Sequence, residues 1–354
     1  MRVAQLIPSV MEHDAMSNYV LQLDEIMAHA GVDSRIFASL VESKVYSSRV
    51  YLLDSLRDFQ PNLLIYHMGI GDPIGEYIQL LGIPYIIYYH NITPSLYFQN
   101  NWPLANLLEW GRRQLSELAK SAIAGMAASE YSKKEMVEVG YKNCYVFPII
   151  IDTQKIALIE DINAEGYGIC DGKDNLCFVG RISPHKKQDD LIRVFKIYKE
   201  HYNSNSRLFL VGSIFDQDYF TLLNRLLAEL DLCRDVEILG LLDEVRWKAY
   251  YRHSRAFVSM SEHEGFCVPL LEAHYFHLPV VAYDGGAVAE VMGGAGILIK
   301  DKTNLLNTAR SIDMVVSNTN MRNELISKGT MNLERFKKEN QAARFIQIIS
   351  GALQ

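Results

Sequence analysis

Short apolar runs alternate along the whole chain with longer segments in which apolar residues recur every three or four positions. The clearest runs are 3–7, 63–67 and 84–90 in the first half, and 176–179, 208–211 and 256–260 in the second. Runs without regular polar positions are typical of parallel strands covered on both faces, and the segments between them are typical of amphipathic helices. The pattern therefore predicts an α/β protein made of two successive series of strand and helix units.

The length of the chain and one polar segment predict a division into two domains. A chain of 354 residues exceeds what a single hydrophobic core usually supports. Residues 152–173 are polar and interrupted by glycines, which is typical of a linker. We expect two Rossmann-like, doubly wound domains facing a cleft, formed by residues 1–165 and 166–331, with a final helix over 332–354 returning to the first domain.

Two local signals mark expected helix ends in the first domain. Gly31 follows an apolar helical segment and is typical of a helix C-terminus. Ser132 stands three residues before Glu135, the spacing of a capping box that opens a helix.

Charge and cysteine content exclude several classes of protein. The net charge of −7 gives no support for binding nucleic acid, and the acidity belongs to the first half, since residues 1–165 carry 12 Lys and Arg against 19 Asp and Glu. The five cysteines form no C-x-x-C pair, which favours a reducing compartment over a disulfide framework. No segment reaches the roughly 18 apolar residues of a membrane span. We expect a cytoplasmic protein.

Residues 102–120 form an amphipathic and locally basic segment that allows two interpretations. Trp102, Trp110, Arg112 and Arg113 combine aromatic and basic side chains, which suits a helix at a lipid surface. The alternative is a helix buried against its own sheet. The first interpretation predicts peripheral contact with the inner face of a membrane.

The stretch 261–273, Ser-Glu-His-Glu-Gly-Phe-Cys-Val-Pro-Leu-Leu-Glu-Ala, follows an apolar run and precedes a helical pattern. Pro269 suits the first turn of a helix, so Glu264 and Glu272 are expected near a helix N-terminus at the carboxyl edge of a strand. Ligands bind at that edge in open α/β sheets. Paired carboxylates act as acid and base or accept hydrogen bonds from sugar hydroxyls. The alternative for both is a helix-capping or first-turn glutamate without a function.

Two glycine loops supply further candidates for a binding site. Gly180 opens a loop in which Arg181 and Lys186 flank a turn, and their two cations suit a diphosphate. The alternative is that these basic residues are simply solvated. The second loop holds paired glycines at 285 and 286, which permit close approach of a ligand or form a plain turn. The chain contains neither a G-x-G-x-x-G fingerprint nor a P-loop, so redox chemistry with a dinucleotide and ATP hydrolysis by a Walker motif lose support.

Taken together, these motifs resemble those of one family. Phe-Val-Gly-Arg-Ile-Ser-Pro-His-Lys (178–186), the stretch 261–273 and Pro-Val-Val-Ala-Tyr-Asp-Gly-Gly (279–286) with Glu290 occur in the order and spacing of the retaining nucleotide-sugar glycosyltransferases of the GT-B fold, often called family four. The resemblance covers nearly the whole chain and is most specific over 176–300.

The resemblance implies a role for each candidate residue of the second domain. Arg181 and Lys186, with Lys187 as an alternative, would hold the diphosphate, and Glu272 would accept hydrogen bonds from the ribose. Glu264, Gly265 and Phe266 would contact the donor sugar and phosphates, and the stretch 240–242, which includes Leu242, would contact the nucleobase.

In the first domain the resemblance places His90 beside the reacting sugar; the alternative is a structural histidine that closes a strand. The chain departs from the family at 14–18, where many members have paired glycines, and Asp14 and Asn18 are candidate replacements there. No cofactor and no metal are expected. The nearest match to the Asp-x-Asp pair of metal-dependent transferases is Asp216-Gln217-Asp218, which is interpreted as a polar loop instead.

The leading hypothesis is transfer of a hexose from a UDP- or GDP-sugar, GDP-mannose among them, to a glycan or lipid-linked acceptor in cell-surface polysaccharide or lipopolysaccharide synthesis. The expected partners are the donor and this acceptor. Two alternatives stay open: a nucleotide-sugar epimerase or phosphorylase of the same fold, and a non-catalytic partner subunit.

Overall fold

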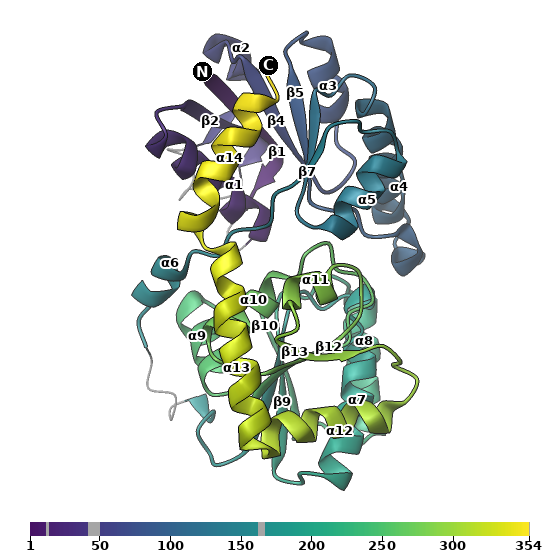
Figure 1. Cartoon of the computed structure of the whole chain (residues 1–354). Coiled ribbons are helices and arrows are strands. Elements are labelled where there is room, and N and C mark those ends of the chain that lie inside the picture. Colours follow the sequence, from purple (N-terminus) through teal and green to yellow (C-terminus); the bar gives the residue numbers. More distant parts are fainter. Residues whose placement is uncertain (12–13, 42–49, 162–166, 354) are drawn as a thin grey trace. The chain divides into compact units, whose positions relative to one another are not determined.

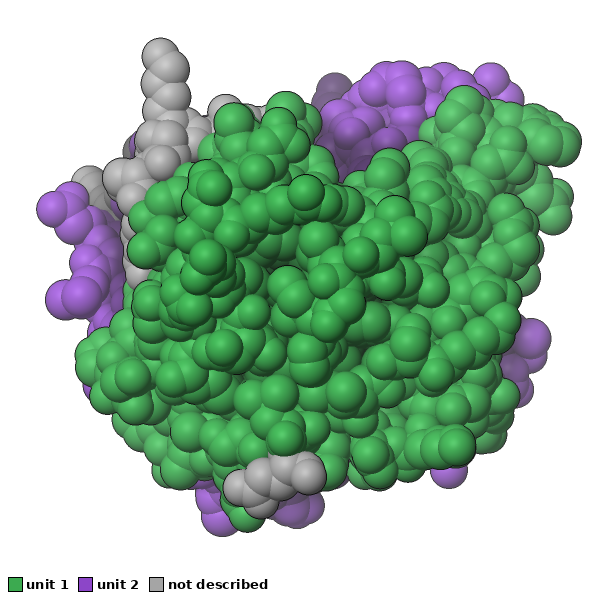
Figure 2. All heavy atoms as spheres, turned by 90° about the horizontal axis from the view of Figure 1, so that it is seen from above, with its two compact units in different colours: residues 1–150, 338–354 green, residues 151–337 purple. Residues whose placement is uncertain are grey.

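The computed structural model describes residues 1–11, 14–41, 50–161 and 167–353 (Figure 1). Their contacts divide the chain into two compact units, which are coloured separately in Figure 2. Unit 1 comprises residues 1–150 and 338–354, and unit 2 comprises residues 151–337. Each unit has its own parallel sheet with helices on both faces, so the predicted α/β class with two Rossmann-like sheets is confirmed.

Unit 1 contains a parallel sheet of seven strands in the order β3-β2-β1-β4-β5-β6-β7. The strands are β1 Arg2–Val10, β2 Asp33–Val41, β3 Val50–Leu52, β4 Leu63–Met68, β5 Tyr85–Tyr89, β6 Ala124–Ala127 and β7 Cys144–Val146. The α-helices are α1 Ala15–His29, α2 Leu56–Phe59, α3 Ile74–Leu80, α4 Trp102–Leu118, α5 Glu130–Glu138 and α14 Lys338–Gly351.

Both faces of the unit 1 sheet are buried under helices, which explains its continuous apolar strands. On one face α1 and α14 pack through side chains such as Leu23, Ile26 and Phe345. On the other face α3, α4 and α5 pack against Tyr66 and its neighbours on the sheet. Helix α14 therefore belongs to the core of unit 1, although it lies at the end of the chain.

Unit 2 contains a parallel sheet of six strands in the order β10-β9-β8-β11-β12-β13. The strands are β8 Asp174–Val179, β9 Ser206–Val211, β10 Val236–Gly240, β11 Ala256–Ser259, β12 Val280–Tyr283 and β13 Gly296–Ile299. The α-helices are α6 Thr153–Leu158, α7 Gln188–His201, α8 Gln217–Glu229, α9 Glu244–Arg252, α10 Val268–Tyr275, α11 Val288–Met292, α12 Leu305–Ser317 and α13 Thr319–Leu333.

The two sheets share the doubly wound arrangement in which the strand order reverses at the centre. The reversal lies between β1 and β4 in unit 1 and between β8 and β11 in unit 2. At such a switch point the loops leaving neighbouring strands diverge, and this leaves a crevice at the carboxyl ends where ligands bind. The fold therefore marks one candidate position in each unit.

The observed division of the chain differs from the boundaries expected from sequence. The boundary expected between 165 and 166 falls in the segment 162–166, outside the described residues, and the contacts divide the chain at 150/151 instead. The reason is that residues following Ile150 already pack in unit 2: Ile151 bridges Lys337 in parallel fashion, and Asp161 pairs with Lys248 at 3.0 Å. The final helix begins at Lys338 rather than at residue 332, because α13 runs to Leu333 and a 3₁₀ turn over Glu334–Phe336 follows it.

Of the two helix ends predicted from local signals, one is confirmed and the other is wrong. Helix α1 ends at His29, and Gly31 follows with a φ of +74°, a conformation that favours glycine, so this prediction is confirmed. The capping-box prediction is wrong, because the N-cap of α5 is Ser129, whose hydroxyl accepts from the backbone N–H of Ser132 at 3.1 Å. Glu135 instead accepts from the hydroxyl of Tyr89 at 2.7 Å.

Candidate active site

The switch point of unit 2 brings together the two sequence motifs that carry charged candidates. Gly180 and Arg181 follow β8 directly, and the stretch 261–264 follows β11, the neighbour of β8 in the sheet. The backbone also joins the two loops, because the N–H of Glu262 donates to the carbonyl of His185 at 2.9 Å. Both motifs therefore lie at the carboxyl edge of the sheet, as their sequences predicted.

Lys186 and Glu264 form an ion pair at this position. The Nζ of Lys186 lies 2.7 Å from both carboxylate oxygens of Glu264. Only 17% of the Lys186 side chain and 7% of the Glu264 side chain are exposed. Because water reaches neither charge well, each charge is stabilised mainly by the other. Glu264 does not cap α10, because the N-cap is Cys267 and its side chain makes no capping bond. The capping alternative for Glu264 is therefore wrong.

The paired glycines hold the Glu264 loop in place. A Cβ on Gly285 would lie 2.1 Å from the carbonyl oxygen of Ser261, and one on Gly286 would lie 2.3 Å from that of Glu264. The backbone N–H of Ala287 then donates to the Glu264 carbonyl at 2.9 Å. These glycines are needed because protein backbone approaches them closely, which neither the ligand nor the plain-turn interpretation had specified.

Glu272 lies one turn into α10 and is held by a tyrosine from α9. The hydroxyl of Tyr251 donates to Oε2 of Glu272 at 2.7 Å. Burial raises the pKa of the Glu272 carboxyl to about 7, and the bond from Tyr251 opposes part of that rise. Tyr251 is itself fixed by stacking, with ring centroids 5.1 Å from Phe276 and 6.3 Å from Phe257. Glu272 is thus a carboxyl that changes charge near neutral pH, rather than an ordinary first-turn glutamate.

Arg181 and the two neighbouring lysines differ in what surrounds them. Arg181 is exposed, and its guanidinium carbon lies 5.2 Å from the ring centroid of Phe215. Lys187 points elsewhere, since its Nζ pairs with Asp189 at 3.0 Å on α7. Of the two lysines, Lys186 is the one beside Glu264. Of the three cations in this loop, Arg181 is thus the exposed one, and Lys186 is the one paired with Glu264.

The side chains of the other candidates of unit 2 are buried or absent. The side chain of Leu242 is buried, whereas its neighbour Leu241 is 55% exposed. The Phe266 ring is also buried and packs edge-on against Phe336, with centroids 5.6 Å apart. Gly265 and Phe266 lie between Glu264 and α10, so their main chain is the part that remains near the ion pair.

His90, the candidate in unit 1, follows β5 at the carboxyl edge of that sheet. Its Nε2 lies 3.1 Å from Nδ1 of His67, the last residue but one of β4. The rings of Tyr88 and Tyr19 pack on it, with centroids at 4.6 Å and 5.8 Å. Burial lowers the pKa of His90 to about 3, so the imidazole is neutral at physiological pH.

Sequence reasoning missed several groups that support these candidates. Tyr251 and His67 were not singled out, although the runs 63–67 and 84–90 both end in a histidine, which was the available signal. Lys302 was also missed; it pairs with Glu262 and, at 3.0 Å, with Asp190. No local pattern points to Lys302, because it lies about forty residues from Glu262 along the chain and the fold alone brings them together.

Three other segments differ in role from what their sequences suggested. Asp14 caps α1, accepting from the N–H of Ser17 at 2.9 Å, so its carboxylate is engaged. Asp216 caps α8 in the same way, with the N–H of Tyr219 at 2.8 Å, and the string 216–218 therefore begins a helix rather than forming a polar loop. In α4, Arg112 turns inward to the carbonyl of Ile92 at 2.5 Å.

The burial of helix α4 agrees with one of the two interpretations of its sequence, that of a helix packed against its own sheet. One face is buried in the core of unit 1 through Leu108, Leu115 and Leu118. Trp102 remains 72% exposed on the other side of the helix. In the part of the chain that the structure describes, no helix has both the length and the apolar character needed to cross a membrane.

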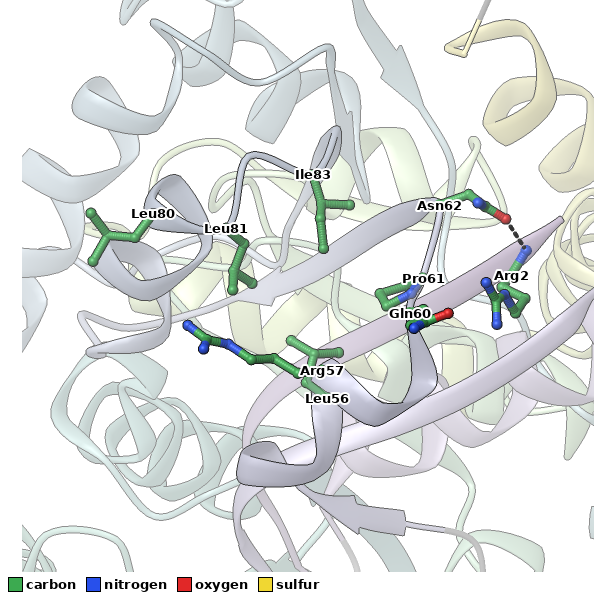
Figure 3. A pocket seen from close by; sticks show the side chains of 9 residues that line it. All are labelled: Arg2, Leu56, Arg57, Gln60, Pro61, Asn62, Leu80, Leu81 and Ile83. Atoms are coloured by element: carbon green, nitrogen blue, oxygen red, sulfur yellow. Dashed lines mark hydrogen bonds between the residues drawn. The ribbon is translucent and has the colours of Figure 1, made fainter.

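A pocket of about 510 Å³ lies at the amino edge of the unit 1 sheet, opposite the carboxyl edge that carries His90 (Figure 3). Its lining comes from the first residue of β1, the turn before β4 and the end of α3, which are the amino ends of the strands. In Figure 3 the side chains of Arg2 and Arg57 extend in different directions, so they do not converge on one point. None of the predicted site residues lines this pocket.

Comparison with known proteins supports the interpretation of this chain as a glycosyltransferase. Residues 160–331 match the family model described as "Glycosyl transferases group 1". A GDP-mannose-dependent alpha-mannosyltransferase of Mycobacterium tuberculosis is 24% identical over 277 residues, which cover 76% of this chain and 67% of that protein.

Solved structures of glycosyltransferases have the same fold over nearly the whole chain. Anabaena HepE, solved with UDP and glucose, superposes with a TM-score of 0.79 at 17% identity and covers 99% of this chain and 100% of that chain. WaaG, a glycosyltransferase involved in lipopolysaccharide biosynthesis, gives a TM-score of 0.75 at 14% identity with the same coverage. The sheet orders, the motifs at the unit 2 switch point and the family match agree. The chain has the GT-B fold, and its residues 160–331 match the family model of the group 1 glycosyltransferases.

Proposed function

We propose that the protein transfers a hexose from a UDP- or GDP-linked donor to a glycan or lipid-linked acceptor, with retention of anomeric configuration and without a metal. The observation that carries the proposal is the unit 2 switch point, where Arg181, the Lys186–Glu264 pair and Glu272 lie on loops and a helix at the carboxyl ends of β8 and β11. The match to group 1 glycosyltransferases and the likeness to a structure solved with UDP and glucose support this assignment.

The charges at this position suit the chemistry of the leaving group. Breaking the anomeric C–O bond leaves negative charge on the nucleoside diphosphate, and fixed cations stabilise that charge more in the transition state than in the ground state. Arg181 is exposed beside the loop, and Lys186 is held in one position by Glu264. Glu272, when ionised, accepts hydrogen bonds from the ribose hydroxyls of the donor.

The choice among donors follows the relatives rather than the site. The relative from Mycobacterium tuberculosis is named for GDP-mannose, and HepE is solved with UDP and glucose, so GDP-mannose and UDP-glucose are the first donors to test. The place of action that we propose is the inner face of the cell membrane in the synthesis of cell-surface polysaccharide or lipopolysaccharide.

Screening of ligands by thermal stability tests the proposal first. A ligand that binds only the folded protein raises its melting temperature by mass action. UDP, GDP, ADP and their sugars are compared, and the donor selected in this way is incubated with candidate acceptors. Release of nucleoside diphosphate together with a new glycosidic bond supports the proposal. Release of free epimer or sugar phosphate without acceptor identifies an epimerase or phosphorylase instead, and binding of no nucleotide contradicts the proposed site.

Replacement of Arg181 by alanine gives the sharpest test of the site. We expect turnover to fall about 100-fold or more, as is typical when a group that stabilises transition-state charge is removed. Arg310→Ala is the matched control, because Arg310 is an exposed arginine on α12, away from the switch point. Equal turnover by the two variants would show that the diphosphate binds elsewhere.

Membrane contact through α4 is part of the same proposal. The exposed Trp102 and the exposed Arg113 are the side chains that would meet a lipid surface, whereas Arg112 is engaged with Ile92 and Glu135. Sedimentation with anionic vesicles at low salt tests it, with Trp102→Ala and Arg113→Ala as variants. Failure of the unaltered protein to sediment with vesicles would remove this part of the proposal and leave the catalytic part intact.

A further inference from the structure

A chain of buried side chains connects the core of unit 1 to His90. Gln5 lies in β1, His67 in β4, and His90 immediately after β5, so the chain crosses three neighbouring strands at the switch point of this unit. His67 Nε2 lies 3.1 Å from Oε1 of Gln5, and His67 Nδ1 lies 3.1 Å from Nε2 of His90. Gln5 and His67 are both inaccessible to solvent.

The direction of every hydrogen bond in this chain follows from its inner end. The amide nitrogen of Gln5 donates to the carbonyl oxygen of Val20 at 3.1 Å. Because a carbonyl oxygen only accepts, the amide nitrogen must face Val20, and the Gln5 oxygen must face His67. That oxygen also only accepts, so His67 carries its proton on Nε2.

The same reasoning fixes the tautomer of His90. A neutral His67 with its proton on Nε2 has a bare lone pair on Nδ1. The nitrogen opposite that lone pair, Nε2 of His90, must therefore carry a proton and donate it. A neutral His90 then has its own lone pair on Nδ1, and within the described part of the chain no hydrogen bond to this atom is present.

The surroundings of the two imidazoles keep both of them neutral. Burial lowers the pKa of His90 to about 3, and burial followed by the proximity of His90 lowers that of His67 well below its ordinary value. The titratable rings of Tyr19 and Tyr88 pack on His90, and burial raises the pKa of both tyrosines. Their hydroxyl protons are directed elsewhere, from Tyr19 to Tyr88 at 2.9 Å and from Tyr88 to the carbonyl of Phe147 at 2.5 Å.

We propose that Gln5 and His67 are positioning residues that hold His90 in the tautomer with a bare Nδ1, so that His90 binds its substrate only as a hydrogen-bond acceptor. A bare ring nitrogen at this position accepts a hydrogen bond from a hydroxyl group and repels a carboxylate or a phosphate oxygen. The substrate group that meets His90 is therefore a neutral hydroxyl, and a sugar bearing an anionic group there is excluded. This inference rests on the proposed function for the presence of a sugar, but the tautomer itself does not depend on it.

Nitrogen-15 NMR of the histidine side chains tests the tautomer directly and without any substrate. The signals of His67 and His90 are assigned from their loss in His67→Gln and His90→Gln. At neutral pH we expect both rings to be neutral with the proton on Nε2. A proton on Nδ1 of His90, or an imidazolium at either residue, would overturn the proposal even if the protein proves to be a glycosyltransferase.

Two substitutions of Gln5 separate positioning from general damage to the core. Gln5→Met keeps the shape but removes the acceptor for His67, so the tautomers are no longer fixed, and kcat/KM for the donor is expected to fall about tenfold, the size of one hydrogen bond. Gln5→Glu is the conservative variant, because a buried, protonated carboxyl has a carbonyl to accept from His67 and an O–H to donate to Val20. We expect it to retain most of the activity and the tautomer of His90.

The binding of nucleoside diphosphate supplies the control for both variants, since its expected site lies in unit 2. Gln5→Met is expected to leave the affinity for the nucleoside diphosphate unchanged while lowering kcat/KM. An unchanged kcat/KM in Gln5→Met, or equal losses in Gln5→Met and Gln5→Glu, would overturn the positioning role. If no nucleotide sugar is turned over by the unaltered protein, the proposed function fails, and the NMR result alone decides the tautomer.

Discussion

The two sheets of this protein reverse their strand order in the same way. The side chains at the two switch points differ in charge. In unit 1 the position is occupied by neutral groups in a hydrogen-bonded chain, Gln5, His67 and His90. In unit 2 it is occupied by charged groups, the Lys186–Glu264 pair and the exposed Arg181. The same crevice of a doubly wound sheet thus presents hydrogen-bond acceptors in one unit and cations in the other. Under the proposed function, the first position would meet a neutral sugar and the second a diphosphate.

Disruption of the Lys186–Glu264 pair is expected to have the largest effect. Glu264→Ala leaves the charge of Lys186 largely buried without its partner, which we expect to lower the free energy of unfolding by about 3 kcal/mol. Turnover is expected to fall about 100-fold or more. Chemical denaturation and the rate of donor consumption measure the two effects.

The double variant Lys186→Met/Glu264→Leu separates stability from chemistry. Replacing both charges with apolar groups removes the unpaired charge, so most of the lost stability should return while turnover stays low. Recovery of turnover together with stability would show that the pair is structural, and would remove the electrostatic contrast between the two units.

Gly285→Ala is expected to have the next largest effect on stability. A methyl group on Gly285 would lie 2.1 Å from the Ser261 carbonyl, so the loop that carries Glu264 must shift, at a cost of about 2 kcal/mol. The matched control is Gly294→Ala, where φ is +76° but nothing lies within 4 Å, so only the backbone cost of about 1 kcal/mol applies. Thermal unfolding compares the two. Equal losses would mean that the 261–264 loop does not depend on its contact with Gly285.

The raised pKa of Glu272 predicts that both the stability of unit 2 and its binding of the donor depend on pH. The pKa of this carboxyl is raised from 4.5 to about 7, so the folded protein retains a proton that the unfolded chain has lost. The contribution of Glu272 to stability is therefore most favourable below about pH 4.5 and declines as pH rises to about 7. Binding of the donor should change in the opposite direction, strengthening as Glu272 ionises and becomes an acceptor for the ribose.

Calorimetric titration with a nucleotide sugar between about pH 6 and pH 8 measures this change, centred on the raised pKa of Glu272. The nucleotide sugar is preferred to the nucleoside diphosphate, because its diphosphate does not titrate in this range. Glu272→Gln is the control and should bind weakly with a flat profile. A flat profile for the unaltered protein would contradict the assignment of Glu272 to the ribose.

Tyr251→Phe is expected to have the smallest effect. The hydroxyl of Tyr251 stabilises the ionised form of Glu272, so its loss should raise the pKa of Glu272 further. The midpoint of the binding profile should move to higher pH, by up to about one pH unit. A midpoint that moves to lower pH would show that the hydrogen bond favours the protonated carboxyl.

The sequence predicted those features of the fold and the site that depend on residues close together along the chain. The apolar runs predicted the strands because burial on both faces leaves no room for polar residues. The motifs at 178–186 and 261–273 placed Arg181, Lys186 and Glu264 in loops that follow strands and Glu272 near the start of a helix, where they are found. The sequence did not predict contacts between elements that are separate along the chain. These are the partners Tyr251 and Lys302, and the close approach of Gly285 to Ser261.

His67 illustrates the same limit within unit 1. Both β4 and the segment after β5 end near a histidine, but only the parallel pairing of the two strands brings the imidazoles within 3.1 Å of each other. Gln5 is a polar residue within an apolar strand, which was a signal for a buried hydrogen-bond partner. Sequence alone could not connect it to residues about sixty and eighty-five positions away.

Hydrogen exchange measured by mass spectrometry tests the central claim, that the charged switch point of unit 2 binds the donor diphosphate. With a saturating nucleoside diphosphate, we expect slower exchange in peptides covering 180–187 and 261–273, where Arg181, Lys186, Glu264 and Glu272 lie. Peptides covering 56–62, at the opposite edge of the unit 1 sheet, should be unchanged. Slower exchange confined to unit 1, with no change in 180–187 or 261–273, would contradict the account.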